Sequence, residues 1–196
     1  MQHTARRSPW TPPESRLASL LMSQATVPSI SSGSRIQYRL QNFSDRPVYC
    51  VLLGVDSDGN AIALYPAPLH RGGKAEPDAS LIKPGETITL PPPAASAEWR
   101  IDSPPGLAET HVVFSAAPLD QTAMALEETV RPTGNARQVS TLSDPLVIGQ
   151  AILSDLHQAS QAARGEGLEL GSDVYALHVD KWATLSFYYR VDEASA

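Results

Sequence analysis

The chain has 196 residues, and 15 Lys and Arg against 21 Asp and Glu give it a formal net charge of -6 at pH 7. A negative chain would repel nucleic acid phosphates and anionic lipid, so we expect neither as a partner. Its single cysteine, Cys50, excludes an internal disulfide and a cysteine-rich zinc site. No apolar stretch suits a signal peptide or a membrane-spanning helix, and together these features predict a cytoplasmic protein without a cofactor.

The N-terminal part has two segments of different character. Residues 1–11 show no apolar periodicity and are expected to form a flexible tail or linker left from a longer polypeptide. Thr11 to Glu14 then has the spacing of a capping box, which predicts a short helix through about Gln24. Residues 12–196 are expected to fold as one domain around one core.

A run of strands is predicted between residues 36 and 65. Apolar and polar residues alternate from Ile36 to Gln41, as in a half-buried strand, whereas residues 48–55 are apolar on both faces, as in a central strand. Residues 56–60 favour a reversal into a third strand at residues 61–65. The expected arrangement is an antiparallel meander of two hairpins in series.

Later segments add more strands. Residues 87–90 alternate and are followed by three prolines, which predicts an edge strand, and residues 99–101 and 110–115 add two more. Residues 182–191 predict a long closing strand with Leu185 and Phe187 on one face. We expect these two side chains to be buried between layers together with Cys50 and Leu52.

Two helices are predicted in the second half of the chain. Asp120 can cap a short helix through Leu126. Asp144, Pro145 and Gly165 bracket a long helix at residues 145–164, whose apolar residues recur every three or four positions. The resulting fold class is mainly β: an antiparallel β-sandwich of Ig-like type with one long helix in the C-terminal half and short accessory helices.

The candidates for catalysis and metal binding are few. Cys50 could act as a nucleophile with His111 as its base, but it lies in the most apolar strand, which favours a buried structural thiol. Residues 56–60 resemble part of a calcium loop, yet the distal glutamate is missing, so a hairpin turn is favoured. His178 and Asp180 form the one close His/Asp pair, and a surface pair is favoured over part of a catalytic triad. We therefore predict no catalytic residues and no metal site.

Two tryptophans are candidates for a ligand cleft. Trp99 and Trp182 could line an aromatic cleft for a small molecule, a glycan or a peptide. Both are spaced as strand residues, which favours packing. The cleft remains the alternative function.

Several segments together resemble a known domain. They are the strand at residues 36–42, the hairpin at residues 51–66, the turn and strand at residues 84–91, the helix around Asp155 to Ser160 and the ending Trp182 to Phe187. In these segments the chain resembles the domain of unknown function DUF4384, in particular the C-terminal region of cyanobacterial caspase-like proteases, the orthocaspases. The resemblance implies an accessory module that follows a peptidase domain.

The resemblance also sets the expected function. The chain lacks the His-Gly and Gln-Ala-Cys segments of the caspase-like domain, so it is expected to be no enzyme but a regulatory module that binds a protein, including a peptidase domain in cis. Because that family cleaves after Arg or Lys, the resemblance makes Arg7, Arg71 and Arg137 candidate processing sites.

Overall fold

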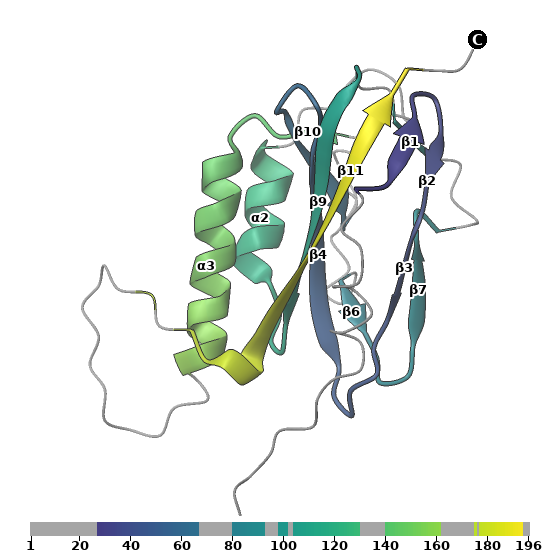
Figure 1. Ribbon diagram of the computed structural model, residues 1–196. Coiled ribbons are helices and arrows are strands. Elements are labelled where there is room, and N and C mark those ends of the chain that lie inside the picture. Colours follow the sequence, from purple (N-terminus) through teal and green to yellow (C-terminus); the bar gives the residue numbers. More distant parts are fainter. Residues whose placement is uncertain are drawn as a thin grey trace, which may run out of the picture.

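The computed structural model describes residues 27–66, 80–92, 98–101, 104–129, 140–161, 175 and 177–193 (Figure 1). These residues form a strand-rich mixed α/β fold in which a large central sheet has two helices on one face and two small sheets on the other. The expected tail and the helix through Gln24 lie outside the described residues.

The central sheet has seven strands in the order β1-β11-β9-β4-β5-β10, with β6 pairing to β4. All neighbours pair antiparallel except β1 and β11, which run parallel. The strands are β1 (Ser29–Ser31), β4 (Val48–Val55), β5 (Ala61–Tyr65), β6 (Leu81–Ile82), β9 (Gly106–Ser115), β10 (Ser140–Thr141) and β11 (Trp182–Asp192).

Strand β4 lies in the middle of the sheet, as the apolar run predicted. It pairs with β9 along one edge and with β5 and β6 along the other. Its side chains Cys50, Val51 and Leu52 are at most 1 % exposed, because both faces of the strand are covered. The predicted reversal between β4 and β5 is confirmed, with Gly59 at a φ of 82° that favours glycine.

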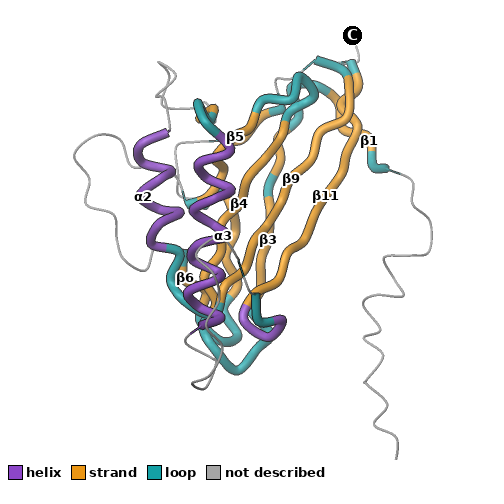
Figure 2. Tube along the Cα trace, turned by 90° about the vertical axis from the view of Figure 1, so that its left-hand side faces the viewer, coloured by secondary structure: helices purple, strands orange, loops and turns teal. Residues whose placement is uncertain are grey.

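Helices α2 (Asp120–Thr129) and α3 (Pro145–Gln161) cover the β4 and β5 part of the sheet (Figure 2). Side chains from both helices and from the sheet make one apolar core: Val51, Ala63, Leu119, Ala125, Leu126, Leu142, Ile148, Ile152 and Leu156. The helices are joined by the buried Asp155, whose carboxylate accepts hydrogen bonds from the backbone N–H groups of Gln121 and Thr122 and from the Thr122 hydroxyl. Asp155 on α3 thus caps the first turn of α2.

Two small sheets pack on the opposite face of the central sheet. One pairs β2 (Arg35–Ile36) with β8 (Trp99–Arg100), and the other pairs β3 (Tyr38–Gln41) with β7 (Thr87–Leu90). A second core lies between them and the central sheet: Leu40, Cys50, Leu52, Leu64, Ile82, Leu90 and Val112. In the turn between β6 and β7, Gly85 follows Pro84 and has a φ of 74°, which favours glycine.

The structure does not show the predicted Ig-like sandwich. One face of the central sheet is covered by helices and not by a second sheet. The apolar residues on one side of α3 are buried only by packing on that face. The first hairpin of the predicted meander is also wrong: β3 pairs with β7 and β4 pairs with β9. A turn after Asn42 separates β3 from β4, and the Asn42 side chain fixes this turn by hydrogen bonds to the backbone of Ser44 and Arg46.

One short strand lies in a segment for which the sequence analysis predicts no strand. Ser29–Ser31 make β1, which pairs in parallel with Arg190–Asp192 at the end of β11. A strand of three residues carries too little alternation to be recognised in a sequence.

Candidate interaction edge on strand β11

Strand β11 has one edge without a neighbouring strand over most of its length. Its inner edge pairs with β9 from Trp182 to Val191 without a break in register. Its outer edge pairs with β1 only from Arg190 to Asp192. Within the described ranges, no strand covers the outer edge from Trp182 to Tyr189, which we call the free edge.

The direction of the backbone groups along the free edge follows from two hydrogen bonds. The Arg190 N–H donates to the Pro28 carbonyl at 2.8 Å on the outer side, and the Lys181 carbonyl accepts from the Ala116 N–H at 2.9 Å on the inner side. Because alternate residues of a strand point their N–H and C=O groups to the same side, every second residue before Arg190 faces outward. These residues are Trp182, Thr184, Ser186 and Tyr188.

The free edge is apolar and carries no charge. Its sequence, Trp-Ala-Thr-Leu-Ser-Phe-Tyr-Tyr, lacks Lys, Arg, Asp, Glu, Gly and Pro. Leu185, Phe187 and Tyr188 are 47 %, 42 % and 49 % exposed, so the prediction that Leu185 and Phe187 are buried is wrong. The helices cover β4 and β5 and leave the β11 part of the sheet open (Figure 2).

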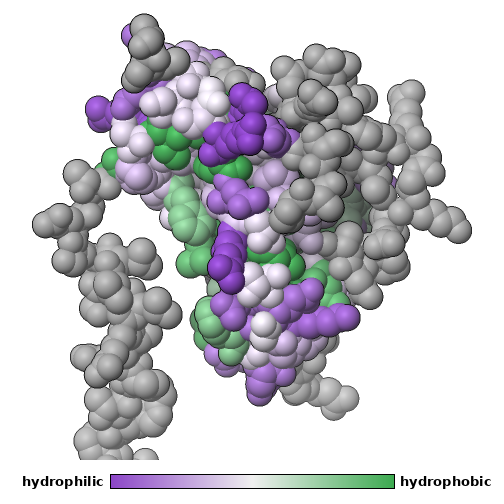
Figure 3. All heavy atoms as spheres, turned by 90° about the vertical axis from the view of Figure 1, so that its right-hand side faces the viewer, coloured by the Kyte–Doolittle hydropathy of each residue, from purple (hydrophilic) through white to green (hydrophobic). Residues whose placement is uncertain are grey.

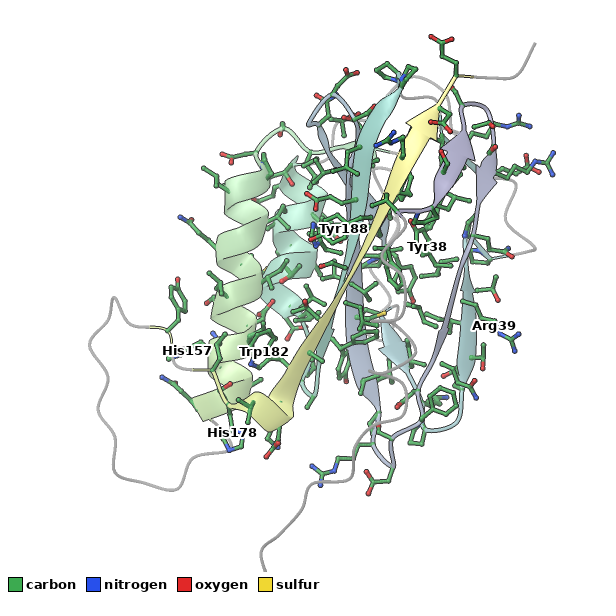
Figure 4. All side chains as sticks on the ribbon, viewed as in Figure 1. Tyr38, Arg39, His157, His178, Trp182 and Tyr188 are labelled. Atoms are coloured by element: carbon green, nitrogen blue, oxygen red, sulfur yellow. The ribbon has the colours of Figure 1, made fainter. Side chains whose placement is uncertain are left out.

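The two faces of β11 differ in chemistry. Leu185 and Phe187 lie on the side of the small sheets, where the Phe187 ring is 6.0 Å from the Tyr38 ring. Thr184, Ser186 and Tyr188 lie on the side of the helices, and Tyr38 and Tyr188 are seen on opposite sides of the strand (Figure 4). On the side of the small sheets, hydrophobic atoms reach the surface between hydrophilic ones (Figure 3).

The other edge of the central sheet is protected. It ends in β10, a strand of two residues that pairs with β5. Short edge strands, lysines and prolines are the usual devices that prevent unwanted strand pairing. The free edge of β11 has none of these devices.

A ladder of polar side chains lies beside the free edge on the helix side. The His111 Nδ1 atom is 2.9 Å from the Ser186 Oγ atom, and its Nε2 atom is 3.3 Å from the Glu109 Oε2 atom. The order of groups resembles a serine, histidine and acid relay. However, Ser186 and His111 are directly paired residues of neighbouring strands, and Glu109 is two residues from His111 on the same face. Cross-strand neighbours of this kind commonly form hydrogen bonds that stabilise the sheet.

A small cavity of about 50 Å³ lies between the central sheet and strand β2. Its walls include the rings of Tyr38, Trp99 and Tyr189, the Arg100 side chain and Asp56. Burial raises the pKa of Tyr38 to about 12, although its hydroxyl lies 2.6 Å from the Thr110 hydroxyl. The Tyr38 phenol is therefore uncharged at neutral pH, and the cavity is large enough for a few water molecules.

The structure keeps Cys50 and His111 apart. Cys50 is fully buried on the small-sheet side of β4, whereas His111 pairs with Leu53 and faces the helix side. Burial raises the pKa of the Cys50 thiol to about 12. The thiol is therefore protonated and out of reach of solvent, which matches the structural role that the sequence indicated.

The turn at residues 56–60 is held by its own side chain. The Asp56 Oδ1 atom accepts from the N–H groups of Asp58 and Asn60, and its Oδ2 atom accepts from the Asn60 amide. These bonds occupy the carboxylate as in an Asx turn. Within the described ranges, no set of His, Cys, Asp and Glu side chains is arranged to hold a metal ion.

The remaining sequence candidates are scattered. Trp99 packs on the core under the small sheets and Trp182 on the core under the helices, so the two do not form one cleft. The Trp182 Nε1 atom is buried without a hydrogen-bond partner among the described residues.

His178 lies directly before the 3-10 helix η1 (Val179–Lys181), and Asp180 lies within it. The Asp180 N–H donates to His178 Nδ1. His178 and Trp182 lie near the end of α3 (Figure 4). Arg7, Arg71 and Arg137 lie outside the described residues.

The sequence interpretation missed the free edge and the Glu109, His111 and Ser186 ladder. One signal for the edge was present: eight consecutive uncharged residues in the final strand have no gatekeeper charge or proline. The ladder depends on the register between β9 and β11, which a single sequence does not reveal.

Comparison with known proteins gives one match. Residues 29–118 match the family described as a domain of unknown function (DUF4384). No curated protein and no solved structure shows significant similarity to the chain. Neither described helix has the length and apolar character that crossing a membrane would need.

The matched range holds β1 to β9 but neither the helices nor β11. The matched strands β9, β4, β5 and β6 pair with one another directly, whereas β1 joins the central sheet only through β11, which lies between β1 and β9. Residues 29–118 are a DUF4384 domain, and in this chain its central sheet is completed by the C-terminal strand.

Proposed function

We propose that the chain is a non-catalytic protein-interaction module that binds an extended segment of a partner along the free edge of β11. The observation that carries this proposal is the free edge itself: Trp182, Thr184, Ser186 and Tyr188 direct backbone groups outward, and no described strand meets them. An added strand would satisfy these groups by main-chain hydrogen bonds.

The side chains support the same mode of binding. A partner strand would meet Leu185 and Phe187 on one face and the hydroxyl groups of Thr184, Ser186 and Tyr188 on the other. Alternate positions of the partner would then be apolar and polar, which gives the site its specificity. The net charge of -6 and the single buried cysteine favour a cytoplasmic protein partner over nucleic acid.

The resemblance to the C-terminal region of orthocaspases suggests which partner to test first. A caspase-like peptidase domain, in cis or in trans, would be bound and regulated through the free edge. Titration of the chain with such a domain should change peptidase activity and slow hydrogen exchange at the Thr184, Ser186 and Tyr188 amides. No binding and no change in activity would remove the peptidase from the proposal.

The general proposal is tested without a known partner. The chain is immobilised at low density and used to select from a displayed library of seven-residue peptides. Recovered peptides should alternate apolar and polar residues and should fail to bind the Leu185→Lys variant, which places a charge on the edge. Peptides that bind this variant as well as the wild type would contradict strand addition at β11.

The cavity beside Trp99 favours a second candidate function, the binding of one small group of a ligand, such as a side chain of a peptide or a substituent of a small molecule or glycan, because it has room for only a few water molecules. Its aromatic walls and buried hydroxyl groups have the composition of a small ligand site. Gly54 lies in its wall, and a methyl group there would come within 3.4 Å of Leu64 without a severe clash. Gly54→Ala should therefore reduce ligand binding and keep the fold, and unchanged binding would exclude the cavity.

A further inference from the structure

We propose that the strand added to the free edge of β11 is β11 of a second copy of this chain, which makes the protein a symmetric dimer with one continuous sheet. The inference rests on the proposed function, because it names the partner of the same edge. It is argued from the pattern of β11 itself, which is complementary to its own copy.

The backbone pattern selects one register. Two antiparallel copies of β11 related by a twofold axis pair residue i with residue j so that i and j add to a constant. Four residues face outward along the free edge, and all four are paired only when Trp182 meets Tyr188 of the copy and Thr184 meets Ser186 of the copy. Leu185 then lies opposite Leu185 of the copy, and the twofold axis passes between these two residues.

The neighbouring elements permit this register. β1 occupies the outer side from Arg190 onward, and η1 ends at Lys181. The paired segment, Trp182 to Tyr188, lies between these two limits. A register shifted by one outward residue toward Arg190 would bring β1 of one copy against β11 of the other.

The side chains are complementary in the same register. A twofold axis perpendicular to the sheet places like faces side by side. On the small-sheet side, Leu185 meets Leu185 of the copy and Phe187 lies opposite Ala183, so exposed apolar groups cover each other. On the helix side, Thr184 lies opposite Ser186, so hydroxyl groups meet hydroxyl groups.

Charge is compatible with self-association at this edge. Each chain carries a net charge of -6, so two copies repel each other at long range. The free edge has no charged residue, and the nearest charges along the strand, Lys181 and Arg190, are both basic. The paired segment, Trp182 to Tyr188, therefore brings no two charges together.

The test uses opposite charges at the residue on the axis. Sedimentation equilibrium should give the mass of a dimer for the wild type at high concentration and of a monomer on dilution. Leu185→Lys and Leu185→Glu should each shift dimer formation to at least about tenfold higher concentration, because like charges would meet at the axis. An equimolar mixture of the two variants should restore the dimer, since the introduced lysine of one chain then meets the introduced glutamate of the other.

Restoration by mixing cannot result from misfolding, and circular dichroism of each variant serves as the folding check. Leu107→Lys is the matched control, because Leu107 is 60 % exposed and lies on β9, away from the free edge; it should dimerise like the wild type. A wild type that stays monomeric, or a mixture that stays monomeric, overturns the second copy as partner. If peptides selected on the wild type still lose binding on Leu185→Lys, the proposed function stands although this inference has failed.

Discussion

Strands β4 and β11 have similar sequences and opposite environments. Both are long and apolar, and neither carries a charge in its central part. β4 is paired on both edges and covered on both faces, so Leu52 is fully buried. β11 is paired on one edge and open on both faces along most of its length, so Leu185 is 47 % exposed.

The difference shows that apolar composition serves two purposes in this chain. In β4 it builds the core that holds the helices and the small sheets to the central sheet. In β11 the same composition forms a surface that the described chain leaves uncovered, which a stable monomer ordinarily avoids. We interpret β4 as the structural strand and β11 as the strand for partner binding.

The largest expected effect is the difference in stability lost when one leucine of each strand is shortened to alanine. Leu52→Ala should lower the free energy of unfolding by about 4 kcal/mol, because it leaves a cavity in a fully covered site. Leu185→Ala should lower it by less than about 1 kcal/mol, since the side chain is already half in water. Urea denaturation of both variants measures the contrast. Equal losses would mean that β11 is as much a part of the core as β4.

The next effect concerns the helical layer that covers β4 and not β11. Asp155→Ala should cost about 3 kcal/mol, because it leaves the Gln121 and Thr122 N–H groups and the Thr122 hydroxyl without their buried acceptor. Asp144→Ala, at the exposed start of α3, is the matched control and should cost about 1 kcal/mol. Thermal unfolding monitored by circular dichroism compares them. If both variants lose the same stability, the Asp155 cap does not hold α2 to α3.

A third effect follows from pH. Burial raises the pKa of Cys50 from 9.0 to about 12, so the folded chain keeps the thiol protonated while the unfolded chain ionises it. Stability should be complete below pH 9 and fall by up to about 1.4 kcal/mol per pH unit from there toward pH 12. Tyr38 and Tyr65, whose pKa values burial raises from 10.0 to about 12, should add to the loss above pH 10.

Urea denaturation at pH 8, 9, 10 and 11 measures this dependence, and Cys50→Ala supplies the comparison. The variant should be less stable at pH 8 because of its smaller side chain, but its stability should begin to fall near pH 10 instead of pH 9. An unchanged onset would show that the thiol ionises as freely in the folded chain as in the unfolded one.

The smallest effect is expected at the polar ladder beside the free edge. Ser186→Ala removes one exposed hydrogen bond to His111 and should change the free energy of unfolding by less than about 0.5 kcal/mol. We also expect no labelling of Ser186 by a fluorophosphonate probe. Labelling that Ser186→Ala and His111→Ala both abolish would make the ladder a catalytic relay and contradict a non-catalytic module.

Much of the fold could be predicted from the sequence where local patterns are strong. The apolar run of β4, the turn held by Asp56 and the stripe of α3 each lie in one continuous segment, and the structure confirms them. The pairing of β3 with β7 could not be predicted, because it joins segments far apart in the chain. The same limit produced the wrong Ig-like sandwich.

The candidate site was predicted less well, for a physical reason. An alternating strand shows which residues share a face, and the structure confirms that Leu185 and Phe187 share one. It does not show whether that face is covered, because coverage depends on how far α2, α3 and the small sheets extend across the central sheet. Most of the final strand lies beyond the part of the sheet that they cover.

Hydrogen exchange measured residue by residue along β11 tests the central claim most directly. In dilute protein the Leu185 and Phe187 amides, which face β9, should be protected, whereas the Thr184, Ser186 and Tyr188 amides should exchange at least about tenfold faster. These three amides should become protected when a strand partner binds. Equal protection of all five amides in the dilute monomer would show that the edge is already covered, and the account of β11 as a binding strand would be wrong.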